Sequence, residues 1–317
     1  MKALVTGATG FIGSRLAPAL ADRGHDVRCL IRDASRAARF RAAGLELREG
    51  DLLDRRSLAG AGEGVDVAYY LVHSMGRGGT RAGFAERELQ AAANFGALAR
   101  DEGVKRIVYL GGLGDRPTSE HLRSRAETAA VLRSEGPPLT YFRAAMVIGP
   151  GSEGYEILGH LVKRLPAMIA PAWLRNRTQP IAVGDVLAYL AQAGERAETA
   201  GREIQIGGPD VVTYGELIHT MADVLGVRRR PQLPVPLLNP RLSSLWIGLV
   251  TPVDAGVARP LIESLAVETI VTDRSGHELL DVEPMPVREA LRRSLEEVAG
   301  GSADERERSV QPLRPQA

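Results

Sequence analysis

The chain has 317 residues, a formal net charge of +1 and a hydrophobic fraction of 44%. Its length is sufficient for one large core and a smaller lobe, and its near-zero net charge does not point to nucleic acid or to an anionic membrane. A strand begins at Lys2, where a secretory signal would stand, so a cytoplasmic location is expected.

The first predicted strand, residues 3–5, runs into a glycine-rich loop, and an amphipathic helix follows. Gly7 allows a tight turn, Gly10 lets the backbone approach a pyrophosphate, and Gly13 lets the helix pack close to the strand. The N–H groups and the positive end of the helix dipole would then hold the phosphates. The segment therefore predicts a dinucleotide site. Its predicted binding residues are Gly7, Thr9, Gly10, Phe11, Ile12 and Gly13.

The second predicted strand, residues 26–31, ends where such sites distinguish NAD from NADP. Arg32 occupies the position at which an acidic residue would bind the ribose 2′-hydroxyl, and Arg36 follows one helical turn later. Two guanidinium groups suit a 2′-phosphate, which favours NADP. The alternative is that Asp33 reads the ribose, shifted by one position, in which case the cofactor is NAD.

The third and fourth predicted strands add candidates at their carboxyl ends. Asp51 and Leu52 follow the third strand, where they would meet the adenine. Leu71, Val72 and His73 end the fourth strand. Because ligands of parallel sheets bind beyond the carboxyl ends of the strands, all five residues are predicted to line the cofactor.

The remaining elements alternate between helix and strand, which indicates right-handed crossovers and a parallel sheet. Further helices are predicted at residues 84–100, 119–133, 155–165, 185–193 and 213–225, and further strands at 105–110, 139–148 and 203–206. Residues 176–183 are predicted to form a loop that closes on the site. The predicted fold class is α/β, a Rossmann-type doubly wound parallel sheet with a small C-terminal substrate lobe.

The same pattern predicts how the chain is divided. Residues 1–150 form the dinucleotide-binding core, to which residues 181–207 return, and residues 151–180 and 208–298 form the substrate lobe. The segment 299–317, rich in glycine, serine, proline and charge, is expected to be a disordered tail.

The apolar segment 242–262 and the single cysteine are both expected to have structural roles. The apolar segment 242–262 is too interrupted to cross a membrane, because Asp254, Arg259 and two prolines lie within it, and a buried or interface helix pair is expected instead. Cys29, the single cysteine, lies in a strand and is expected to be buried and inert. No metal site is predicted.

Several longer motifs point to one known family. They are Thr6-Gly-Ala-Thr-Gly-Phe-Ile-Gly13, Gly50-Asp51-Leu52, the helix that bears Asn94, and Arg143-x-x-x-Val-Ile-Gly-Pro150. With these motifs, residues 1–295 resemble the extended or atypical short-chain dehydrogenase/reductases. The shorter strings Tyr70-Leu-Val-His-Ser-Met75, Asn176-Arg-Thr-Gln-Pro180 and Gly207-Gly-Pro-Asp210 resemble the NAD(P)H-binding, NmrA-like branch, which includes relatives of the 39-kDa accessory subunit of respiratory complex I.

The resemblance implies a catalytic Tyr-x-x-x-Lys pair on the helix after the fifth strand, and a serine or threonine at the end of that strand. This chain departs from the pattern. His121 stands at the tyrosine position, Arg125 at the lysine position, and Gly112 near the serine position. No tyrosine elsewhere in the sequence is followed four residues later by lysine or arginine. Arg125 is still expected to bind the ribose hydroxyls.

Three functions remain open. The chain could be a reductase in which His121, or His73 in the same cleft, replaces the tyrosine as acid or base. It could bind NADP(H) without turnover, as a redox sensor or as an accessory subunit of a protein complex. It could also reduce a quinone or enone by direct hydride transfer, which needs no tyrosine acid. The favoured interpretation is an oxidoreductase that uses NADP(H), with NAD possible, and acts on a small apolar carbonyl, enone or quinone.

Overall fold

The computed structural model describes most of the chain. The described residues are 1–33, 35, 38–72, 81–114, 119–164, 168–170, 172–229, 231–234 and 265–300. Among the predictions, Arg36, His73, the segment 242–262 and residues 301–317 of the expected tail lie outside these ranges.

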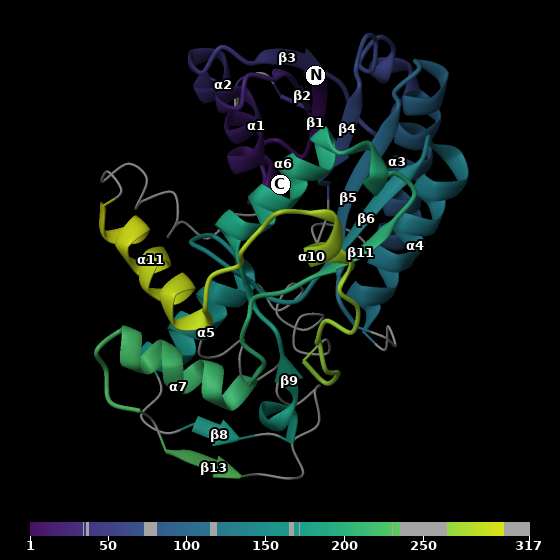
Figure 1. Cartoon of the computed structure of the whole chain (residues 1–317). Coiled ribbons are helices and arrows are strands. Elements are labelled where there is room, and N and C mark those ends of the chain that lie inside the picture. The colour runs from purple at the N-terminus through teal and green to yellow at the C-terminus, as the bar shows by residue number, and fades with distance from the viewer. Residues whose placement is uncertain are drawn as a thin grey trace.

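Seven parallel strands form the central sheet, in the order β11-β6-β5-β4-β1-β2-β3 (Figure 1). The strands are β1 (Lys2–Thr6), β2 (Asp26–Ile31), β3 (Glu46–Glu49), β4 (Val67–Tyr70), β5 (Arg106–Gly112), β6 (Leu139–Ala144) and β11 (Glu203–Ile206). The chain moves outward from β1 through β2 to β3, and then returns to the other side of β1 as β4. Ligands of such sheets bind where the strand order reverses, so the expected crevice lies beyond the carboxyl ends of β1 and β4.

Helices cover both faces of the sheet (Figure 1). On one face α1 and α6 pack against Ala3 and Val5 of β1, and on the other α3 and α4 pack around Leu4. This alternation follows the two-residue period of a strand, and burial of both faces explains the apolar runs of the central strands β1, β4 and β5. The long helices of these layers are α1 (Gly13–Asp22), α3 (Arg81–Asp101), α4 (Glu120–Glu135) and α6 (Val183–Glu195). The Rossmann-type prediction is confirmed.

A second hydrophobic cluster lies below the sheet in Figure 1, and it is built from helices that follow β6. Its long helices are α5 (Glu153–Arg164), α7 (Tyr214–Val224) and α11 (Val287–Gly300). A capping box formed by Thr213 and Glu216 opens α7, at the start of the helix predicted at residues 213–225. The short strands near this cluster are β7 (Val147–Ile148), β8 (Met168–Ala170), β9 (Arg177–Thr178), β10 (Ile181–Ala182), β12 (Val212–Thr213) and β13 (Gln232–Pro234). The remaining short helices are α2 (Ala38–Ala42), α10 (Ser275–Leu279), η2 (Arg55–Leu58), η3 (Ala172–Arg175) and η4 (Ala197–Thr199).

Three predictions of local structure were wrong. The strand expected at 139–148 is two strands, because β7 leaves the central sheet and pairs with β10 instead. The loop expected at 176–183 therefore contains β9 and β10. The expected tail begins too early, because α11 continues through Gly300. Within the described ranges, no helix is both long and apolar enough to cross a membrane.

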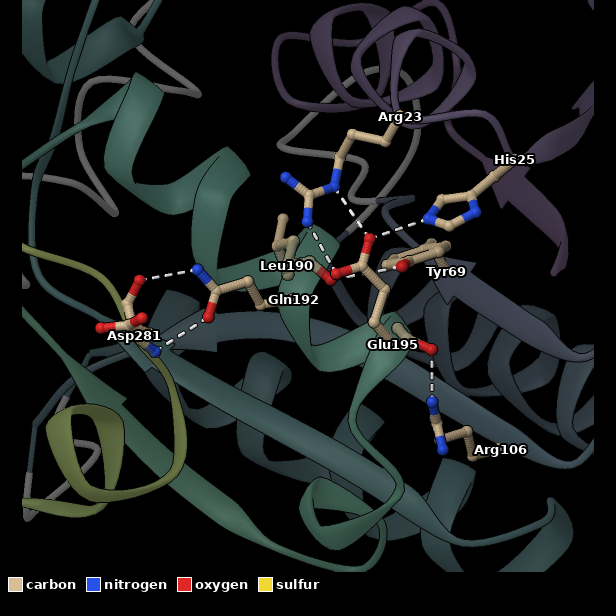
Figure 2. A network of polar contacts seen from close by, with 9 residues as sticks. Arg23, His25, Tyr69, Arg106, Leu190, Gln192, Glu195 and Asp281 are labelled. Atoms are coloured by element: carbon tan, nitrogen blue, oxygen red, sulfur yellow. Dashed lines mark hydrogen bonds and ion pairs between the residues drawn. The ribbon is translucent and has the colours of Figure 1, made fainter.

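A charged network joins α1, β2 and α6 at the amino-terminal edge of the sheet (Figure 2). The carboxylate of Glu195 accepts two hydrogen bonds from Arg23, at 2.8 and 2.6 Å, and its Oε1 lies 2.9 Å from Nε2 of His25. The hydrogen bonds from Arg23 lower the pKa of Glu195 to about 2, with a further contribution from His25 and an opposing one from burial. This edge is opposite the one where the cofactor is expected, so the network is assigned a structural role.

Replacing Glu195 with glutamine should lower the free energy of unfolding at pH 7 by about 1 kcal/mol or less, since solvent screens the pair. The folded-state pKa lies below the ordinary value of 4.5, so the stabilisation is present above pH 4.5 and is lost as the pH falls towards 2. Urea unfolding at pH 7, 5 and 3 measures this. The difference in unfolding free energy between wild type and Glu195→Gln should become smaller as the pH falls. Glu198→Gln, at an exposed position on η4, should have little effect at any pH. A difference independent of pH would contradict the assignment.

Candidate cofactor and active site

The glycine loop is held tightly between the ends of β1 and β4. Gly7 has a positive φ of 64°, which glycine adopts without the strain that a side chain would add. A Cβ at Gly7 would lie 2.4 Å from the carbonyl oxygen of Leu71, and a Cβ at Gly13 would lie 2.3 Å from the carbonyl oxygen of Gly7. Glycine is therefore required at both positions by contacts within the protein itself.

The hydroxyl of Thr6 connects the two strands beneath this loop. It donates to the carbonyl of Tyr69 at 3.1 Å and accepts from the N–H of Leu71 at 3.2 Å. The side chain is almost fully buried. It fixes the half-buried Leu71 and Val72 beside the glycine loop, where both were predicted to line the cofactor.

Three backbone N–H groups are left without partners at the start of α1. Gly10 donates to Gly7 at 2.8 Å and Ser14 donates to Gly10 at 3.0 Å, which closes the loop. Between them, the N–H groups of Phe11, Ile12 and Gly13 donate to no atom of the described residues. Unpaired N–H groups at a helix start, where the dipole is positive, attract phosphate oxygens. The cradle suits a pyrophosphate.

At the end of β2, the side chains of Arg32 and Asp33 differ in their hydrogen bonding. Oδ1 of Asp33 accepts from the backbone N–H of Ser35 at 2.9 Å and from its hydroxyl at 2.6 Å. Arg32 is exposed, and its guanidinium makes no hydrogen bond or ion pair with the described part of the chain. The acidic side chain is thus committed to a local turn, whereas the basic one is available for a ligand.

The loop after β3 places Asp51 and Leu52 near the same edge. Oδ1 of Asp51 accepts from the N–H of Leu53 at 3.0 Å, and the amide nitrogen of Asn94 donates to the carbonyl of Leu52 at 2.7 Å. Asn94 is buried on α3 and also accepts from Gln90 at 2.9 Å. Asn94 therefore holds the predicted adenine loop in place from behind.

His121 and Arg125 lie side by side on α4. Ser119 caps the helix through a hydrogen bond from the N–H of Leu122. Nε of Arg125 donates to Nε2 of His121 at 3.2 Å, and its Nη1 donates to the carbonyl of Leu110, near the end of β5, at 2.9 Å. Since Nε2 of His121 accepts, the proton of the neutral ring is assigned to Nδ1. Nη2 of Arg125 has no partner in the parts of the chain that are described.

The side chain of Leu122 lies over Gly112 at the end of β5, where the resembling family has a serine. A Cβ at Gly112 would lie 2.5 Å from Cδ2 of Leu122 and 3.6 Å from Cδ of Arg125. A serine at position 112 would therefore require the end of the Leu122 side chain to move.

Comparison with known proteins agrees with this geometry. A family of NAD(P)H-binding proteins matches residues 7–160. The chain is 27% identical over 264 residues to sterol demethylase protein B of Methylococcus capsulatus, covering 76% of this chain and 79% of that protein. It is 27% identical to the mitochondrial NADH dehydrogenase (ubiquinone) 1 alpha subcomplex subunit 9 of Arabidopsis thaliana, covering 74% of this chain and 61% of that protein. These matches support the resemblance to the NAD(P)H-binding, atypical short-chain dehydrogenase/reductases.

A solved structure shows the same fold for the whole molecule. An NADPH-dependent quinone oxidoreductase of Escherichia coli, complexed with NADPH, superimposes with a TM-score of 0.72 at 18% identity, covering 93% of this chain and all of that one. The similarity to the plant subunit agrees with the NmrA-like branch predicted from the shorter motifs. The match of residues 7–160 to NAD(P)H-binding proteins supports a nicotinamide dinucleotide as the cofactor.

Proposed function

We propose that this protein is an NADP(H)-dependent oxidoreductase that reduces a small apolar carbonyl, enone or quinone. The observation that carries the proposal is the phosphate cradle, in which three N–H groups at the start of α1, next to the end of β1, have no acceptor among the described residues. Around it, Gly7, Thr9, Gly10, Leu52, Leu71 and Val72 are proposed to line the dinucleotide, with Asp51 at the adenine. Residues 151–180 and 208–298 are proposed as the lobe that shelters the substrate.

The preference for NADP rests on the contrast at the end of β2. The carboxylate of Asp33 accepts two hydrogen bonds from Ser35, whereas the guanidinium of Arg32 makes no contact with the described residues and can bind a 2′-phosphate. Arg36, on the same segment, is proposed as a second contact. The quinone oxidoreductase of Escherichia coli, which is named NADPH-dependent, supports the same choice.

Replacing Arg32 with alanine should remove most of the preference for NADPH over NADH. A charge-assisted hydrogen bond to phosphate contributes roughly 1.5–3 kcal/mol, so NADPH should bind about tenfold or more weakly. NADH binding should change little, because its ribose has no phosphate for Arg32 to contact. Titration of cofactor fluorescence with both dinucleotides measures this. Equal affinity for NADH and NADPH in the wild-type protein would contradict the assignment.

The roles at α4 follow from its geometry. Nη2 of Arg125 is proposed to bind the ribose hydroxyls in place of the family lysine, since its other donors already fix the side chain. His121 is proposed to supply, in its protonated form, the proton for the acceptor oxygen, and His73 is a second candidate for this role. The bound dinucleotide would supply the hydride.

Oxidation of NADPH against a panel of quinones, enones and aldehydes tests the proposal directly. Turnover with one of these classes is expected. A binding constant for NADPH, measured on the same sample, separates a protein that binds without turnover from one that is misfolded.

A non-catalytic role is the second candidate, and one observation favours it. All three residues of the family triad are replaced, with Gly112 near the serine position, His121 at the tyrosine position and Arg125 at the lysine position. The relative in Arabidopsis thaliana is named as a subunit of an NADH dehydrogenase, which suggests a part in a protein complex. Tight NADPH binding with no oxidation of any acceptor would favour this sensor or accessory function.

A further inference from the structure

Arg15 connects the phosphate cradle to the segment where the chain leaves for the second lobe. Its Nη1 donates to the carbonyl of Phe11 at 3.1 Å, and its Nη2 donates to the carbonyl of Pro150 at 2.8 Å. The same Nη2 lies 3.2 Å from Oε1 of Glu297 on α11. The guanidinium also lies over the ring of Phe11, 4.8 Å from its centroid.

The bond to Phe11 determines where an N–H group of the cradle points. All described peptide bonds are trans, and a trans peptide directs its C=O and N–H to opposite sides. The carbonyl of Phe11 is held by Arg15, and Ser14 also donates to it at 3.4 Å. The N–H of Ile12, in the same peptide, is therefore aimed the other way, and it is one of the three unpaired groups.

The ring of Phe11 is seated on the loop that contains Pro150. A Cβ at Gly149 would lie 3.2 Å from Cζ of Phe11, and one at Gly151 would lie 3.8 Å from its Cδ2. Gly151 has a positive φ of 85°. The aromatic ring and the guanidinium thus both contact the 149–151 loop, so a shift of the cradle would disturb the entry to the second lobe.

We propose that Arg15 is a positioning residue for dinucleotide binding, and that it couples the phosphate cradle to the 149–151 loop. It holds the Phe11–Ile12 peptide in the orientation that presents an N–H to the pyrophosphate. The inference rests on the proposed dinucleotide site. It adds a residue that contacts no part of the expected ligand and acts only through the backbone.

The hydrogen bonds from Arg15 to the carbonyls of Phe11 and Pro150 are proposed to position the cradle, and the ion pair with Glu297 contributes little. The side chain of Glu297 is 54% exposed, and exposed ion pairs have little net effect on stability. Hydrogen bonds from a charged donor to a partly buried carbonyl are stronger. Glu297→Gln is therefore the matched control, because it removes the ion pair and keeps both carbonyl contacts.

The test measures NADPH affinity and hydrogen exchange in wild type, Arg15→Met, Arg15→Lys and Glu297→Gln. The methionine variant keeps an unbranched side chain over Phe11 and removes every donor, so NADPH should bind roughly tenfold or more weakly. The affinity of Arg15→Lys for NADPH should lie between those of wild type and Arg15→Met, because a single ammonium group cannot reach both carbonyls as the planar guanidinium does. Glu297→Gln should bind within about twofold of wild type. In wild type, NADPH should protect the amides of both 8–16 and 147–152, whereas in Arg15→Met the protection of 147–152 should be lost.

Three results would overturn the inference, and a fourth would overturn the proposed function on which it rests. Unchanged NADPH affinity in Arg15→Met would show that the cradle is positioned without Arg15. Should Arg15→Met fail to fold, wild-type affinity in Arg15→Lys would overturn the inference in the same way. NADPH binding in wild type without protection of 147–152 would refute the coupling. Failure of wild type to bind either NADPH or NADH would instead refute the proposed function.

Discussion

Replacing Gly10 with valine is expected to abolish NADPH binding while the chain stays folded. Among the described residues, a Cβ at Gly10 would meet one atom within 4 Å, the carbonyl oxygen of Gly7 at 3.1 Å, which would have to move by a few tenths of an ångström. The branched side chain would then fill the space in front of the unpaired N–H groups, which the pyrophosphate needs. Loss of the phosphate contacts should weaken binding by roughly 100-fold or more, on a scale of 1.4 kcal/mol for each tenfold.

The other loop glycines provide the contrast. Gly13→Val would place a Cβ 2.3 Å from the carbonyl oxygen of Gly7 and 2.9 Å from Cα of Ala8, so it should lower the melting temperature as well as binding. Fluorescence titration with NADPH and thermal unfolding by circular dichroism separate the two effects. A folded Gly10→Val variant that binds NADPH with unchanged affinity would show that the loop is only structural.

The glycine loop could be predicted from sequence because its determinants are local. The turn at Gly7, the close approach at Gly13 and the start of α1 all lie within one short stretch of the chain. The strand at Asp26–Ile31 was predicted with its observed bounds for the same reason, since an apolar run between turns identifies it. The capping box at Thr213 likewise needs only four consecutive residues.

The errors arose where distant parts of the chain decide the outcome. Residues 139–148 are largely apolar, so the pattern does not show that β7 leaves the sheet to pair with β10. Asn94 was recognised only as a family motif, and its contact with the carbonyl of Leu52 spans 42 positions. The contacts of Arg15 could not be predicted from sequence, because its partner Pro150 is 135 positions away. An arginine in a helix has no local signal for such a role.

The proposed chemistry depends most strongly on His121. Its ring nitrogen Nε2 accepts from Arg125, so the histidine is oriented by the residue that is proposed to hold the ribose. That arrangement places the proposed acid and the proposed cofactor contact on one helix. Carbonyl reduction needs a proton on oxygen in addition to hydride on carbon, whereas direct hydride transfer to a quinone needs no protein acid at that step.

Replacing His121 with phenylalanine should therefore slow turnover of an aldehyde or ketone by roughly 10²–10⁴-fold. Quinone reduction should change much less, and NADPH affinity should stay within about twofold, because the phosphate cradle and Arg32 are untouched. Replacing the exposed Arg123, two positions along the same helix, with glutamine is the matched control and should leave all three quantities unchanged. Steady-state kinetics with one acceptor of each kind, combined with cofactor titration, provides the measurement.

Full carbonyl activity in His121→Phe would remove histidine from the chemistry and leave direct hydride transfer as the mechanism. Parallel loss of carbonyl activity, quinone activity and NADPH binding would show that the imidazole instead supports Arg125 in holding the cofactor.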